Sequence, residues 1–274
     1  MWKLNLSLFY RMSPYLLLSL CVSAGYGLMA WRLFQRTQPQ PAWLQALLSL
    51  LLLLHAGLVY ESVLGQGVIT LGFGNSLSAI SWLTAVIYWT TRRHTPLARI
   101  QAWVTVFAAV AILLPAIFPN AHAIPHSEAL ALRAHLVVSL LAYSLFAIAA
   151  LHAVLMTTLE KKLHRGATLR EGAPPLLTLE AILFKTILAG FILLSLTVFS
   201  GVVFSEELFE KPLQLTHKIV FALLSWGVFG GLLLGRHFRG WRGRMALYWT
   251  LTGFVFLLLA YIGTQFVLEV VLKR

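Results

Sequence analysis

Imidazole side chains are the groups in this chain most able to do chemistry, because nine histidines occur among 274 residues of which only 11% are charged. His135 is followed by Ser139 and Tyr143 at positions i+4 and i+8, so these three residues would share one face of a helix. His217 stands directly before Lys218, at the start of another apolar stretch. Two imidazoles from different helices at one membrane depth could supply the opposed axial ligands of a haem iron. Alternatively, both are interfacial histidines that form hydrogen bonds at helix ends.

Two further histidines have contrasting surroundings. His55 lies inside an apolar run that ends in Tyr60 and Glu61, where lipid would not solvate it, so it needs a protein or ligand partner. It is either a ligand or a buried, satisfied histidine. His237 lies between Arg236 and Phe238 in basic surroundings typical of a surface residue.

The elements that position these side chains are transmembrane helices. Residues of hydrophobic type make up 59% of the chain, and a bilayer core about 30 Å thick takes roughly 20 helical residues per span. We therefore expect an all-α, polytopic membrane protein of about eight helices, forming a single membrane domain over residues 1–274. The expected spans are 14–33, 44–61, 75–92, 99–118, 132–156, 181–204, 214–234 and 245–267.

The distribution of cations indicates a membrane surface rather than nucleic acid as the partner of this basic chain, whose formal net charge is +12. The connections after the third, fifth and seventh spans are rich in Lys and Arg, whereas the intervening ones are poor in them. By the positive-inside rule, both termini should face outward. The single Cys21 excludes an internal disulfide and any multi-cysteine metal site.

Sequence signatures of common catalytic sites are missing. We find no P-loop, no HExxH, no GxSxG and no paired carboxylates within the spans. A conventional hydrolase or ATPase is therefore not expected, and no catalytic residue is assigned.

The second half of the chain, residues 126–274, resembles the cytochrome c assembly (CcsA/ResC/HemX-like) membrane protein family, and most closely its YpjD branch. Residues 1–125 match more loosely, through His55 and Tyr60 to Ser62. The segments that carry the resemblance follow one another in the family's order: His135 to Tyr143, Pro174 to Glu180, Ser200 to Glu207, Leu215 to Lys218, Gly235 to Arg244 and Gly253 to Gly263.

The resemblance implies haem handling in a bacterial inner membrane. His135 matches the family's first external histidine, and His55 and His237 resemble its two membrane histidines. The tryptophan-rich WWD signature is missing between Phe204 and Thr216, and a second external histidine is missing near the last helix. We therefore expect non-covalent binding of haem b, with haem or apocytochrome delivery partners, but not covalent attachment. The haem-ligand candidates are His135, His217, His55 and His237, and no other metal is expected.

Two alternatives from other functional classes remain open. An acidic cluster, Glu206, Glu207 and Glu210, would suit a transport or transport-accessory role such as metal-ion efflux. The basic connections would suit a regulatory scaffold for a haem-biosynthetic enzyme.

Overall fold

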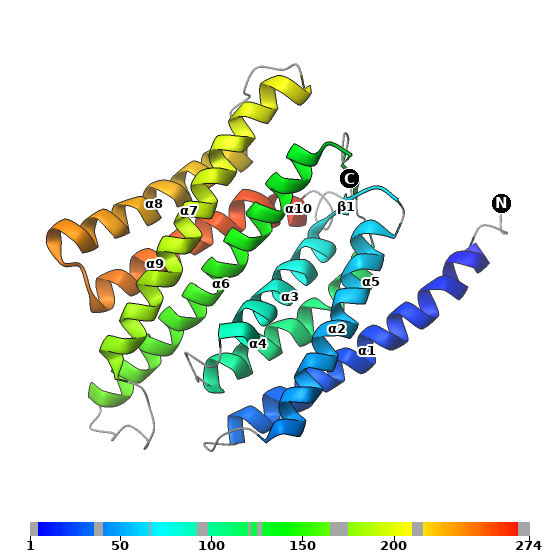
Figure 1. Cartoon of the computed structure of the whole chain (residues 1–274), viewed down its shortest axis with the longest axis horizontal. Coiled ribbons are helices and arrows are strands. Elements are labelled where there is room, and N and C mark those ends of the chain that lie inside the picture. The colour runs from blue at the N-terminus through cyan, green and yellow to red at the C-terminus, as the bar shows by residue number, and fades with distance from the viewer. Residues whose placement is uncertain are drawn as a thin grey trace. The chain divides into compact units, whose positions relative to one another are not determined.

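The computed structural model describes residues 5–35, 41–65, 67–91, 98–119, 122–124, 128–164, 175–209 and 216–267. Nearly all of them are helical (Figure 1). The helices are α1 (Asn5–Gln35), α2 (Ala42–Leu64), α3 (Phe73–Thr91), α4 (Ala98–Ala111), α5 (Leu114–Ile117), α6 (Leu130–His164), α7 (Leu176–Phe209), α8 (His217–Arg239), α9 (Gly243–Leu258), the π-helical turn η1 (Leu259–Gly263) and α10 (Thr264–Phe266).

The predicted all-α, polytopic architecture is confirmed. Each of the eight expected spans coincides with a helix, if α4 with α5 and α9 with η1 and α10 are each counted as one interrupted rod. Within the described part of the chain, seven helices are long and apolar enough to cross a membrane. Several exceed the expected bounds, because a helix need not stop where the hydrocarbon stops: the 35 residues of α6 extend about 50 Å.

Helix α3 is the expected span that lies outside this set of seven. Its polar side chains point into the protein, since Asn75, Ser76, Ser78, Ser81 and Thr84 are at most 5% exposed. A helix surrounded by other helices can carry hydroxyl and amide groups that lipid would not accept. Its low hydropathy therefore reflects burial inside the protein.

A break separates α4 from α5 next to a proline. Pro115 has no backbone N–H to donate, and the α-helix is interrupted between Ala111 and Leu114. Gly74 of α3 lies against the break: a Cβ at this position would come within 2.7 Å of the Leu114 carbonyl oxygen. Glycine is needed there because two backbones meet.

Contacts divide the chain into two compact units. Unit 1 comprises residues 1–127 and 265–274, and unit 2 comprises residues 128–264. The single domain stays a prediction. In unit 1 the two-residue strands β1 (Thr70–Leu71) and β2 (His122–Ala123) pair antiparallel and join the α2–α3 connection to the segment before α6.

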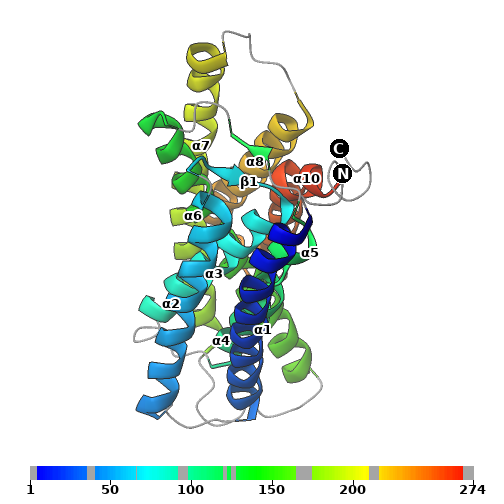
Figure 2. The ribbon, with the colours of Figure 1, turned by 90° about the vertical axis from the view of Figure 1, so that its right-hand side faces the viewer.

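Unit 2 is an antiparallel arrangement of α6, α7, α8 and α9 with η1. Its centre is a pair of stacked rings, Phe146 of α6 and Phe229 of α8, whose centroids are 3.8 Å apart. Helices α6 and α8 begin at one end, here called the His135 end, and α7 and α9 begin at the other, here called the Glu180 end. The first turns of α6 and α8 and the last turns of α7 lie toward the same end in both views (Figures 1 and 2).

Candidate functional site

His135 is held by a serine from the neighbouring helix. The Nδ1 atom of this half-buried imidazole lies 2.7 Å from the Oγ atom of Ser200 on α7. The Ser200 hydroxyl also donates to the Leu196 carbonyl oxygen, at 2.7 Å, and to that of Thr197, at 3.2 Å. A hydroxyl has one hydrogen, and a carbonyl can only accept. These contacts favour the tautomer in which the Ser200 oxygen accepts from His135 and the proton is on Nδ1.

This protonation state fits an iron ligand. With Nδ1 protonated, a neutral imidazole carries its lone pair on Nε2, which is the form that binds a metal, and a partner at Nδ1 orients the ring. Within the described residues, no group of three or more His, Cys, Asp or Glu side chains could hold a metal ion. A haem iron needs only axial ligands from the protein. His135, held in this way, could supply one such axial ligand.

His217 and Lys218 lie at the same end of unit 2. His217 is the first residue of α8 and is exposed, whereas Lys218 is half-buried. The Lys218 Nζ atom lies 5.7 Å from the centroid of the Tyr261 ring, in the π-helical turn η1. This end therefore presents two imidazoles and an ammonium group from two helices.

Of the polar stripe expected below His135, Tyr143 bonds to another helix and Ser139 bonds within α6. The Tyr143 hydroxyl donates to the Leu257 carbonyl oxygen of α9 at 2.9 Å, and the Ser139 hydroxyl donates to Leu136 within its own helix. The prediction that this face points toward protein is confirmed for Tyr143.

His55 is completely buried in unit 1. Its Nε2 atom lies 3.1 Å from the Ser78 Oγ atom of α3, and its ring meets the Tyr26 ring edge-on at 5.7 Å. Its Nδ1 atom has no hydrogen-bond partner among the residues that the structure describes. For one ring nitrogen only, Ser78 thus supplies the partner that an intramembrane His55 was expected to need.

His237 lies at the opposite end of unit 2 from His217. Twenty residues of α8 separate the two, which is about 30 Å along the helix, so they cannot ligate one iron. His237 is exposed and its ring contacts Phe238 edge-on. This agrees with its expected position at the surface.

His152, which the sequence did not single out, is the second fully buried histidine. It lies on α6 and is 2% exposed. Its Nδ1 atom donates to the Ile148 carbonyl oxygen at 2.9 Å, and its Nε2 atom has no partner in the described part of the chain. It is 17 residues from His135, about 25 Å along the same helix. It therefore does not belong to the His135 end.

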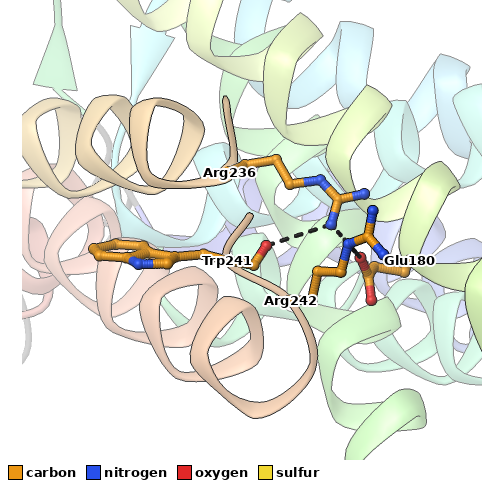
Figure 3. Close-up of polar contacts among 4 residues, drawn as sticks. All are labelled: Glu180, Arg236, Trp241 and Arg242. Atoms are coloured by element: carbon orange, nitrogen blue, oxygen red, sulfur yellow. Dashed lines mark hydrogen bonds and ion pairs between the residues drawn. The ribbon is translucent and has the colours of Figure 1, made fainter. Parts of the chain in front are cut away.

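A buried carboxylate organises the Glu180 end (Figure 3). The Arg236 Nη1 atom of α8 lies 2.5 Å from the Glu180 Oε1 atom of α7 and 3.4 Å from the Trp241 carbonyl oxygen. The Arg242 Nε atom lies 3.8 Å from the same carboxylate oxygen. These contacts fix the α8–α9 connection, where Gly240 adopts the left-handed conformation with φ 65°.

The acidic cluster behind the metal-efflux alternative is not described by the structure. The backbones of Glu206 and Glu207 lie in the last turns of α7, but their side chains, and all of Glu210, lie outside the described residues.

Comparison with known proteins identifies the family. Residues 43–272 match the family described as cytochrome C assembly protein, which extends the resemblance from the second half into α2. Inner membrane protein YpjD of Escherichia coli strain K12 is 29% identical over 220 residues, 80% of this chain and 81% of that protein. Cytochrome c biogenesis protein CcsA of Prochlorococcus marinus strain MIT 9215 is 33% identical over 88 residues, 32% of this chain and 28% of that protein. The chain therefore belongs to the cytochrome c assembly protein family.

Proposed function

We propose that this protein binds haem b non-covalently at the His135 end of unit 2 and exchanges it with haem or apocytochrome delivery partners in a bacterial inner membrane. His135 is the first axial ligand, His217 is the second, and His55 is an alternative or transit ligand. The observation that carries the proposal is the Ser200 contact, which orients the His135 ring and favours the tautomer with its lone pair on Nε2. The relatives named for an inner membrane and for cytochrome c biogenesis support it.

The distribution of charge supports a periplasmic position for this site. Four arginines cluster at the Glu180 end, at positions 236, 239, 242 and 244. Because Lys and Arg resist translocation, we place the Glu180 end in the cytoplasm. The His135 end, and with it both termini, then faces the periplasm.

The proposed function is tested by titrating haem into the purified protein in lipid nanodiscs. We expect a Soret band typical of histidine ligation in the wild type and at least about tenfold weaker affinity in His135→Ala, which lacks the axial nitrogen. His164→Ala is a matched control, because His164 is an exposed histidine at the far end of the same helix. Wild-type protein that takes up no haem would refute the proposal.

Removal of the Ser200 hydroxyl should weaken haem binding without removing the ligand. We expect about tenfold lower haem affinity in Ser200→Ala, the lower end of the range for loss of a group that orients a metal-bound histidine. Ser200→Thr retains the hydroxyl and should recover most of the affinity. The measurement is the same spectroscopic titration, and equal affinities for Ser200→Ala and wild type would show that His135 does not depend on Ser200.

A further inference from the structure

Lys218 is an ammonium group held beside an aromatic ring near a membrane surface. It is the second residue of α8 and half-buried, and its Nζ atom lies 5.7 Å from the centroid of the Tyr261 ring. An ion at the edge of a bilayer is costly unless neighbouring groups stabilise it, and an aromatic face supplies part of that stabilisation. Such an ammonium is well suited to bind an anionic group that arrives with a ligand.

The ring that faces Lys218 belongs to an irregular turn that is fixed on two sides. The π-helical turn Leu259–Gly263 interrupts the last long helix, and π-helical turns occur frequently at functional sites. Before the turn, the Leu257 carbonyl oxygen accepts the hydroxyl of Tyr143 from α6 at 2.9 Å. After it, the Thr264 hydroxyl donates back to the Leu259 carbonyl oxygen at 3.2 Å. The bond from Tyr143 thus anchors the helix just before the turn to α6, and the Thr264 bond closes the turn on its other side.

The Lys218–Tyr261 contact lies at nearly the depth of His135. From the contact between Tyr143 and Leu257, His135 is eight residues away along α6, or about 12 Å. Tyr261 is four residues away in the same direction along the antiparallel last helix, or about 6 Å. The two positions thus differ in depth by only about 6 Å along the helix axes, so Lys218 and His135 lie at similar levels of unit 2.

We infer that Lys218, supported by Tyr261, binds a carboxylate of the ligand whose iron His135 ligates, so that the site selects the dicarboxylate form of the macrocycle. This inference rests on the proposed function. It adds a second point of attachment, which orients the macrocycle with its carboxylates toward α8. It also gives the site a preference that iron ligation alone does not provide, since an imidazole does not distinguish a free acid from its ester.

The test compares haem with haem dimethyl ester, which carries the same iron and no carboxylate. We expect the wild-type protein in nanodiscs to bind haem about tenfold more tightly than the ester, as for one charge-assisted hydrogen bond. Lys218→Met should lose this preference by binding haem about tenfold more weakly while its affinity for the ester is unchanged. Lys218→Arg should restore the preference, and Arg133→Gln, which removes an exposed cation at the same end, should retain it.

The outcomes separate this inference from the proposed function. Equal affinity of wild-type protein for haem and its ester overturns the role of Lys218 and leaves haem binding intact. Equal weakening of both compounds in Lys218→Met also overturns it, because a purely structural role has that effect. If wild-type protein binds neither compound, the proposed function fails, and this inference fails with it. If the Lys218→Met variant does not fold, Lys218→Gln takes its place in the same comparison of haem with its ester.

Discussion

Replacing Glu180 by leucine is expected to lower the free energy of unfolding by about 3 kcal/mol, the lower end of the cost of breaking a buried ion pair. Glu180 is 7% exposed, and its carboxylate receives the Arg236 guanidinium from α8 at 2.5 Å. Leucine would leave this guanidinium without its acceptor. The lower end of the range applies because 29% of the Arg236 side chain is exposed, so water can solvate part of the charge.

Two further variants separate the ion pair from general disruption of this end. Arg242→Gln should cost less than about 0.5 kcal/mol, because the Arg242 side chain is 63% exposed and its Nε atom lies 3.8 Å from Glu180. The double variant Glu180→Leu with Arg236→Met should recover most of the lost stability, since no unpaired charge remains. The measurement is equilibrium unfolding in detergent micelles, followed by tryptophan fluorescence. Equal losses of unfolding free energy for Glu180→Leu and Arg242→Gln would contradict the expectation that the Glu180–Arg236 pair contributes more than the Arg242 contact.

The helices could be predicted from sequence because the bilayer leaves few alternatives. A chain in hydrocarbon must satisfy its backbone hydrogen bonds internally, so a long apolar run bounded by Pro and Gly indicates a helix. The predicted helices are least accurate where the chain leaves the hydrocarbon or is surrounded by protein. Helix α6 continues to His164, past the expected end at 156, because a helix can extend from the membrane into water. Helix α3 carries buried hydroxyl groups, because its neighbours are protein.

The candidate site was predictable residue by residue but not as a set of contacts. His135 could be chosen from its place at the start of an apolar run. Its partner Ser200 is 65 residues further on, and that pairing depends on how α6 and α7 are rotated against each other. The contact between Lys218 and Tyr261 depends on a π-helical turn, which has no distinct hydrophobic period.

The length of α8, in contrast, is enough to show that its two histidines lie at opposite ends of the helix and cannot share one iron. His217 and His237 are the first residue and the third from last of a 23-residue helix. A rise of about 1.5 Å per residue is enough to place them on opposite sides of a bilayer. Which of them faces the periplasm stays a prediction of the positive-inside rule.

Gly253→Val is expected to destabilise unit 2 by about 3 kcal/mol, the upper end of the usual cost of overpacking. A Cβ at this buried position would lie 2.8 Å from the Phe229 ring, closer than side chains pack. The Phe229 ring cannot move away, because it is fully buried and stacks on Phe146 at 3.8 Å. Relief would require α9 to shift, and the 2.9 Å hydrogen bond from the Ser225 hydroxyl to the Gly253 carbonyl oxygen would then be lost.

Gly227→Val is the matched control for this substitution. Gly227 is a helical glycine on the exposed side of α8, and a Cβ there meets nothing within 4 Å. The control should therefore leave stability unchanged or raise it slightly, because valine has a higher helix propensity than glycine. The same unfolding measurement compares the two variants. Similar stabilities of Gly253→Val and Gly227→Val would mean that the Phe146–Phe229 stack can shift to make room for an added side chain. The centre of unit 2 would then be loosely packed rather than fixed by close contact at Gly253.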